Sequence, residues 1–273
     1  MSQENFDLVV VVTTHNSAET IKECLDSVNR LHDGIRIILF VHDDGSTDNT
    51  KQILASYKSV IPFQYFFSDK NQGRPFGLIN GIRKTKSKYI SILDSDDVST
   101  ADRLSESFHK LEACPELDLV SGQIQKFGSW GREKPSNFPT NFSSIESWLK
   151  AGRNPIAHSA VTFRRSWYEE AGGYSHELPF CLDYDLFLRG LKNHNYFISE
   201  KIYCLYRTEN RTPNFSYWKN SRLYRDLVLE NFRRSAGGTN KPPGLRARTL
   251  NKNSALLIRY FLLKLFTRRI HQM

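Results

Sequence analysis

The sequence lacks several features that would assign it to a class at once. It contains no run of roughly eighteen apolar residues, the length that a helix needs to cross a bilayer. Its four cysteines are scattered and form no Cys-x-x-Cys pair, which predicts reduced thiols in a cytoplasmic protein. The sequence has no His-x-x-x-His pair, so we expect no zinc site. The first ten residues are acidic and polar, so we expect no secretory signal there.

Two phosphate-binding motifs are also missing. No Gly-x-x-x-x-Gly-Lys-Ser/Thr sequence occurs, and no Gly-x-Gly-x-x-Gly sequence follows the first predicted strand. P-loop and Rossmann cofactor sites both need such a loop to surround a phosphate with backbone N–H groups. The sequence therefore argues against both classes.

Negative charge is scarce at one end of the chain. The net charge is +9, but residues 216–273 alone hold thirteen Lys/Arg and two acids, which leaves residues 1–215 at −2. A nearly neutral body with a basic tail is not typical of a nucleic-acid-binding protein. It indicates a domain that meets an anionic surface through one end.

The first hundred residues alternate two periodicities. Apolar, β-branched runs predict strands at 8–14, 35–41, 63–67 and 89–93. Helical spacing predicts helices at 16–31, 46–57 and 77–86 and a fourth that begins at Ser99, with capping boxes from Asn16 to Glu19 and from Ser99 to Asp102. This alternation predicts an α/β fold, with a mostly parallel sheet and helices on both faces. Ligands bind such sheets at the carboxyl ends of the strands.

The pattern weakens after residue 115. Residues 126–144 are rich in Gly, Pro, Ser and Asn and predict long loops. A helix at 145–150, a strand at 160–165 and a helix from Asp183 to Lys192 follow, and residues 235–244 have the composition of a linker.

Three carboxylates, Asp94, Asp96 and Asp97, follow the fourth predicted strand. In an extended segment, alternate side chains such as Asp94 and Asp96 point the same way. Hard oxygen ligands suit Mg²⁺ or Mn²⁺, which often share substrate phosphate oxygens. The alternative is an ordinary acidic turn, but the position at the end of a strand favours the metal.

Other polar residues allow two interpretations each. Asp43 and Asp44 form either a tight turn or a carboxylate that accepts a hydrogen bond from a nucleobase. Asp183 is either a helix N-cap or a general base that accepts a proton from an attacking hydroxyl. His15 follows the first strand as a loop histidine, and His158 is expected to be buried and hydrogen-bonded.

Several stretches together are more specific than any one of them. In order they are VVTTHNSAETIKECLDSV, VHDDGSTDNT, YISILDSDD, NPIAHSAVTFRRSWYEEAGGY, LDYDLFLRG and YCLYR. This series, over residues 7–207, resembles the inverting glycosyltransferases of family 2, which have the GT-A fold. The resemblance implies a nucleotide-sugar-binding half at 1–115, an acceptor and catalytic-base half at 116–215, and a basic helical extension at 216–273.

The resemblance also implies a role for each matching residue. The expected nucleotide-binding residues are Thr13, His15, Asp44, Arg74 and Asp94. Asp96 and Asp94 would hold the divalent cation, Mn²⁺ or Mg²⁺, and Glu209 stands where the family often has a histidine near the metal. Asp183 would be the catalytic base, and the expected acceptor or sugar contacts are Asp97, His158 and Asp185. The family usually has Glu-Asp at the base, whereas here Leu182 precedes Asp183.

The implied activity is transfer of a sugar, with inversion, from a UDP-sugar to a hydroxyl of a saccharide acceptor that is lipid-linked in many members. Cell-surface polysaccharide, such as O-antigen, capsule or lipopolysaccharide, is the expected product. A nucleotidyltransferase remains an alternative, but it would need a glycine-rich basic loop where this chain has TTHNSAE. A dehalogenase-like phosphatase would carry Asp-x-Asp after its first strand. A non-catalytic sugar-nucleotide-binding module is the third alternative.

The tail from Ala255 to Phe266 is apolar, with basic residues within and after it. One interpretation is a C-terminal helix packed on the domain or in a homo-oligomer contact. The other is peripheral attachment to the cytoplasmic face of a bacterial inner membrane, with long basic side chains that reach anionic headgroups.

Overall fold

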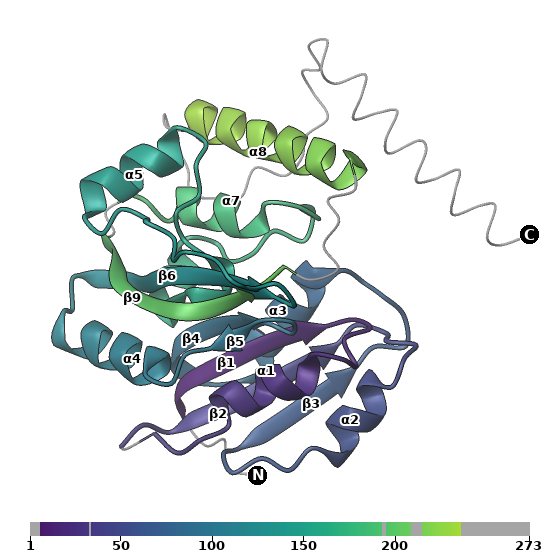
Figure 1. Ribbon diagram of the computed structural model, residues 1–273. Helices are drawn as coiled ribbons and strands as arrows, with labels where there is room; N and C mark the ends of the chain where they lie inside the picture. Colours follow the sequence, from purple (N-terminus) through teal and green to yellow (C-terminus); the bar gives the residue numbers. More distant parts are fainter. Residues whose placement is uncertain (1–5, 33, 193–194, 209–214, 236–273) are drawn as a thin grey trace, which may run out of the picture. The chain divides into compact units, whose positions relative to one another are not determined.

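A computed structural model describes residues 6–32, 34–192, 195–208 and 215–235 (Figure 1). All of them belong to one compact unit, Met1–Lys241. Glu209 and the tail beyond residue 235 lie outside the described residues. The predictions made for them therefore stay predictions, as do the proposed boundaries near residues 115 and 215.

The first four long strands form the parallel half of the sheet. β1 (Phe6–Thr14) lies between β2 (Ile37–Asp43) and β4 (Ser87–Asp94), and β3 (Phe63–Phe67) pairs with β2. The residues of β1 from Leu8 to Val12 are fully buried. A strand that is covered on both faces has no solvent-exposed face, so its residues are apolar throughout instead of alternating between apolar and polar. The predicted strands are confirmed to within about two residues, the usual uncertainty of element boundaries.

The second half of the sheet is mixed. β8 (Thr162–Arg164) runs antiparallel to β4 and to β6 (Leu117–Gly128), and β6 pairs in parallel with β9 (Asn195–Arg207). Two short strands, β5 (Val98–Ser99) and β7 (Gly131–Arg132), pair antiparallel with β9 and β6. The sequence pattern weakens here because the long strands are only partly buried.

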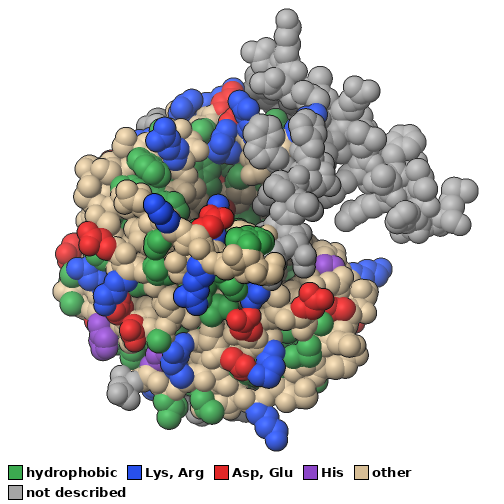
Figure 2. Space-filling view, viewed as in Figure 1, with side chains coloured by type: hydrophobic (Ala, Val, Ile, Leu, Met, Phe, Trp, Pro, Cys, Tyr) green, Lys and Arg blue, Asp and Glu red, His purple; other side chains and the backbone are tan. Residues whose placement is uncertain are grey.

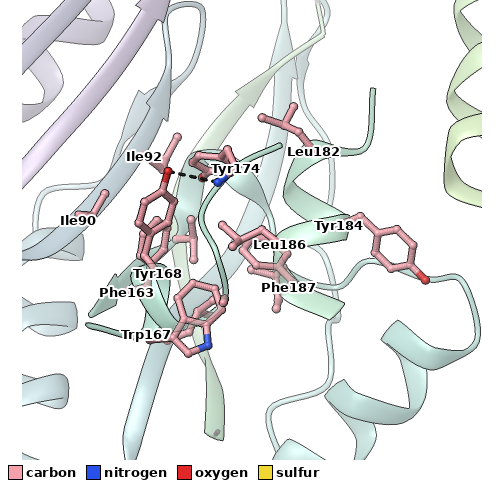
Figure 3. Packing of buried hydrophobic residues seen from close by; sticks show 14 of the residues in the cluster. Ile90, Ile92, Phe163, Trp167, Tyr168, Tyr174, Leu182, Tyr184, Leu186 and Phe187 are labelled. Carbon is pink, nitrogen blue, oxygen red and sulfur yellow. Dashed lines mark hydrogen bonds between the residues drawn. The ribbon is translucent and has the colours of Figure 1, made fainter. Parts of the chain in front are cut away.

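Helices cover both faces, as predicted (Figure 1). One core joins the sheet to α1 (Ile21–Val28), α2 (Thr50–Ser56) and α4 (Arg103–Ala113). The other joins it to α3 (Arg74–Lys84), α5 (Phe142–Lys150), α6 (Arg165–Glu170), α7 (Leu182–Arg189) and α8 (Phe215–Ser235). Figure 3 shows Phe163, Trp167 and Tyr168 packed beside Leu186 and Phe187 of α7 in this second core.

Three predicted helix starts are wrong. Asn16 does not cap α1, which begins at Ile21. Ser46 does not open α2, and Ser99 lies in β5 rather than at the start of α4. Asn16 instead accepts from Thr47 N, Ser46 donates to Asp43, and the hydroxyl of Ser99 donates to the backbone oxygen of Thr100. Side-chain hydrogen bonds of this kind compete with helix capping.

Surface charge is mixed on the face seen in Figure 2, where acidic and basic side chains are interspersed over the described residues. Among the described residues, no helix is both long and apolar enough to cross a membrane.

Candidate active site

A cleft of about 920 Å³ opens at the carboxyl ends of β1, β2 and β4. Its size is typical of a small-molecule site. Six residues that the sequence singled out line it: Thr13, His15, Asp44, Arg74, Asp94 and Asp96. They meet here because parallel strands end at the same edge of the sheet.

The neighbouring acids Asp43 and Asp44 have different roles. Asp43 Oδ1 accepts a hydrogen bond from Ser46 N (3.0 Å) and closes the turn after β2. Asp44 lines the cleft, and its two oxygens accept from the backbone N–H groups of Gln72 (2.8 Å) and Gly73 (2.7 Å). An ionised carboxylate has about four lone-pair sites, so Asp44 can still accept from a nucleobase.

Gly45 makes this arrangement possible. Its φ is +73°, and a Cβ atom there would lie 2.8 Å from backbone atoms of Lys70 and Asn71. The two loops therefore approach closely only because residue 45 has no side chain. That approach brings the N–H groups at 72 and 73 to Asp44.

His15 is tied to the same loop. Its Nδ1 lies 2.9 Å from the backbone oxygen of Asp44, and because a carbonyl only accepts, Nδ1 must carry the proton. Asn16, next to it, has φ +52° and accepts a hydrogen bond from Thr47 N (2.8 Å) through its side-chain oxygen. The predicted capping residue thus joins the loops after β1 and β2 and fixes the position of His15.

The three carboxylates at the end of β4 form a tight cluster. Ligand atoms of Asp94, Asp96 and Asp97 lie within 4.8 Å of one another. Asp97 is fully buried, and its Oδ1 accepts from Arg207 N (2.9 Å). Burial, together with the charges of Asp94 and Asp96, raises the pKa of Asp97 to about 7. Its Oδ2 has no hydrogen-bond partner among the described residues.

This cluster fits a divalent cation. Its donors are carboxylate oxygens, the ligand type that Mg²⁺ and Mn²⁺ prefer. A cation there would offset the repulsion between like charges and the cost of the buried, unpartnered oxygen of Asp97. Asp94 and Asp96 line the cleft, and Asp97 stands behind them.

Arg74 connects the cluster to a buried histidine. Its guanidinium pairs with Asp94 Oδ1 and donates to Nδ1 of His158 (2.5 Å). Because arginine only donates, Nδ1 of His158 must accept, and Nε2–H then donates to Tyr174 Oη (2.8 Å). Burial, followed by the charge of Arg74, lowers the pKa of His158 to about 4, so the imidazole is neutral. His158 is therefore buried and hydrogen-bonded, as predicted.

Asp183 lies beside this network, in the first turn of α7. Burial lowers the pKa of Arg74, but the charges of Asp94 and then Asp183 outweigh it and raise the pKa overall. The residue that precedes α7 is Cys181, so Asp183 is not the N-cap. Its carboxylate Oδ2 accepts instead from Asn154 Nδ2 (2.9 Å).

The residues on either side of Asp183 have structural partners. Leu182 is buried in the core, which accounts for an apolar residue where the resembled family usually has an acid. Asp185 pairs with Arg189 (2.7 Å), and that guanidinium also donates to the backbone oxygen of Gly173 (2.6 Å). A contact of Asp185 with the acceptor stays a prediction.

Sequence reasoning gave no role to Arg207 or Asn154. Arg207 ends β9, lines the cleft, and donates to the backbone oxygen of Asp96 (2.9 Å). Asn154 follows α5 and precedes a proline in the stretch NPIAHSAV, in which the sequence pointed to His158. An asparagine before proline is a turn signal, and that signal alone gave no reason to pair it with Asp183.

A comparison of the sequence with family models decides the assignment. The model of glycosyl transferase family 2 matches residues 9–172, more than half of the chain. The chain belongs to glycosyl transferase family 2. It is a glycosyltransferase, and the nucleotidyltransferase and phosphatase alternatives fall away.

Two curated relatives illustrate the similarity. The chain is 24% identical over 184 residues to the amylovoran biosynthesis glycosyltransferase AmsE of Erwinia amylovora, covering 67% of this chain and 68% of the relative. It is 29% identical over 167 residues to a poly-beta-1,6-N-acetyl-D-glucosamine synthase of Staphylococcus epidermidis, covering 59% of this chain and 40% of that protein.

Solved structures share the fold and confirm the GT-A prediction. TarS 1–349 of S. aureus in complex with UDP-GlcNAc superposes with a TM-score of 0.65 at 17% identity, over 85% of this chain and 73% of that one. The mannosyltransferase PcManGT of Pyrobaculum calidifontis, in complex with GDP-Man and Mn²⁺, gives 0.62 at 17% identity, over 96% and 81%.

Proposed function

We propose that the protein is a metal-dependent, inverting glycosyltransferase that transfers a sugar from a UDP-sugar to a hydroxyl of a saccharide acceptor. One observation carries the proposal. Arg74 pairs with Asp94 of the acidic cluster, while the charge of Asp183 also acts on Arg74. The group suited to the leaving diphosphate and the group suited to the attacking hydroxyl are therefore close enough for their charges to interact.

The donor would lie in the cleft with its base between His15 and Asp44. The imidazole of His15 offers a stacking surface, and Asp44 offers a carboxylate to the uracil N–H. Asp94 and Asp96 would hold the divalent cation, which supplies positive charge to the diphosphate as it leaves. Arg74 adds a second positive charge at the same edge. The UDP-GlcNAc complex of TarS supports a uridine nucleotide, and the Mn²⁺ complex of PcManGT supports a divalent ion.

Asp183 would act as the general base. As an acceptor hydroxyl oxygen attacks the anomeric carbon, its proton passes to the Asp183 carboxylate and the bond from the anomeric carbon to the diphosphate oxygen breaks. Attack from the face opposite the leaving group inverts the anomeric centre in one displacement. No enzyme nucleophile is needed, unlike retaining glycoside hydrolysis, in which a second carboxylate forms a covalent intermediate.

The acceptor would be a growing cell-surface polysaccharide. AmsE is named for amylovoran biosynthesis, and the Staphylococcus relative is named as a polysaccharide synthase. A cytoplasmic site of action beside a membrane-borne acceptor would give the basic, apolar tail a purpose. The tail would then act as a peripheral membrane contact.

A nucleotide-sugar panel tests the proposal. UDP-GlcNAc, UDP-glucose and GDP-mannose are compared, each with and without Mn²⁺, for protection against thermal unfolding and for nucleotide release in the presence of oligosaccharides. We expect a UDP-sugar to protect the protein only when the metal is present. Release of the nucleotide should require Asp96. Asp96→Asn should abolish both effects, whereas Asp102→Asn, a change at an exposed acid near the start of α4, should not. Metal-dependent binding without any release would indicate a non-catalytic binding module.

A further inference from the structure

The hydrogen bond from Asn154 to Asp183 joins two separate parts of the chain. Asn154 lies in the segment between α5 and the short 3₁₀ helix His158–Ala160, and its Nδ2 is 2.9 Å from Asp183 Oδ2. No second hydrogen bond to the Asp183 carboxylate is found among the described residues. Oδ1 is therefore available to another partner.

The amide of Asn154 is itself fixed. Its Oδ1 accepts from the backbone N–H of Ile156 (3.1 Å), and Ile156 is buried. A flipped amide would point its oxygen at the carboxylate and its NH₂ at an N–H group, so both contacts would be repulsive. The local hydrogen bonds thus permit one orientation, with the NH₂ group toward Asp183.

The backbone under Asp183 is also held in place. Cys181 adopts the left-handed conformation (φ +57°) and accepts from Asp185 N (2.9 Å), which starts α7. Leu182 anchors the turn in the core, beside Tyr174 (Figure 3). With the backbone fixed, the side-chain torsions of Asp183 are what remain free, and Asn154 restrains them.

We propose that Asn154 is a positioning residue that binds one oxygen of Asp183 and leaves the other facing the acceptor hydroxyl. This inference rests on the proposed role of Asp183 as the general base. An N–H donor stabilises the ionised form of a carboxylate, which is the form that accepts a proton from a hydroxyl. Without that donor, the Asp183 carboxylate would rotate more freely.

Other groups also act on the Asp183 carboxylate. Arg74 of α3 is the cation whose charge interacts with that of Asp183. His158 is neutral, as shown above. Burial raises the pKa of Tyr174, with smaller contributions from Tyr168 and then Asp183, and burial followed by the charge of Asp183 raises the pKa of Cys181. These three are therefore uncharged at neutral pH, and Asn154 is the neutral donor that bonds directly to the base.

The decisive variant is Asn154→Asp. The new side chain keeps an oxygen to accept from Ile156 N, so the turn survives, but it replaces the NH₂ donor with a carboxylate oxygen facing Asp183. Two facing carboxylates raise the pKa of the pair. The matched control is Asn141→Asp, because the Asn141 side chain likewise accepts a backbone N–H (Ser144 N, 2.9 Å) but stands at the exposed start of α5.

Two measurements are made on the full chain with Mn²⁺. One is the pH profile of kcat with the donor from the nucleotide panel, alongside KM for that donor. The other is an NMR titration of the Asp183 carboxyl ¹³C signal, assigned by its loss in Asp183→Asn. For Asn154→Asp we expect the acid limb of kcat and the carboxyl titration to move up by about one pH unit or more, with donor KM unchanged. Asn141→Asp should match the wild type in both.

A purely structural turn predicts another result. Asn154→Asp would then follow the wild type in both measurements, and the proposal would be overturned. Absence of transfer by the wild-type protein would count against the proposed function instead. The NMR titration still decides the electrostatic role of Asn154 in that case, because it needs no turnover.

Discussion

The guanidinium of Arg74 pairs with the carboxylate of Asp94 at the edge of the cleft. The same nitrogen donates to His158, so one side chain links the acidic cluster to the buried imidazole. Arg74 thereby neutralises part of a cluster that would otherwise hold three adjacent negative charges. When a metal and a diphosphate bind, we expect Arg74 to exchange Asp94 for the phosphate oxygens.

Arg74→Gln should therefore change two affinities in opposite directions. Without the competing cation, Mn²⁺ should bind more tightly to the acidic cluster in the absence of nucleotide. UDP should bind roughly tenfold more weakly or worse, the usual weight of one hydrogen bond to a charged group. Calorimetric titrations of Mn²⁺ and then of UDP measure both. Arg83→Gln, at an exposed position on the same helix, is the control, and unchanged affinities in Arg74→Gln would contradict this role.

His158 should make stability depend on pH on the acid side. Burial and the Arg74 charge lower its folded-state pKa from 6.5 to about 4, so only the unfolded chain binds the proton between these values. The free energy of unfolding should then decrease as the pH falls through this window and show no such effect above it.

His158→Gln should remove that dependence, because glutamine can bond to both neighbours without titrating. Urea unfolding at about pH 5 and about pH 7.5 should show a difference between the two pH values that is about 2 kcal/mol smaller than in the wild type. His109→Gln, at an exposed position on α4, serves as the control. An equal pH dependence in His158→Gln and the wild type would show that His158 is not held neutral.

The basic tail can be tested without shortening the chain. Its four cations are replaced by glutamine in one variant, at Arg259, Lys264, Arg268 and Arg269. We expect the variant to lose binding to vesicles with anionic lipid at low salt, because each basic residue near such a surface contributes about 1 kcal/mol. A control with the same change in charge replaces four exposed lysines of the body, Lys51, Lys58, Lys86 and Lys134. Equal vesicle binding by both variants would exclude a membrane role for the tail.

The sequence predicted the strands well and the helix starts poorly. β1, β2 and β4 are apolar runs because both faces of these strands are buried. A run of this kind can be recognised in a short stretch of sequence. Asn16, Ser46 and Ser99 have the chemistry of helix caps, but Asn16 N donates to Ser46 Oγ beside the cleft, and Ser99 N donates to Ser27 Oγ of α1. The two residues of each of these pairs lie about thirty or more residues apart in the chain, at a distance that local patterns do not reach.

The site residues that lie at the ends of strands could be predicted from the sequence. Asp44 and Asp94 follow buried strands, so topology alone places them at the cleft. Asn154 and Arg207 were missed because their positions depend on how later, irregular segments pack against the sheet. Arg207 reaches the cleft only because β9 pairs with β6 and its last residue meets Asp97.

Asp183 is proposed to be the base of a single displacement. Asp183→Asn keeps the size of the side chain and can still bond to Asn154 through its amide oxygen. With Mn²⁺ and the donor from the panel, we predict that UDP affinity stays within about twofold of wild type while transfer falls roughly 100-fold or more, the usual contribution of a general base. Transfer at the wild-type rate, with UDP binding intact, would contradict the account.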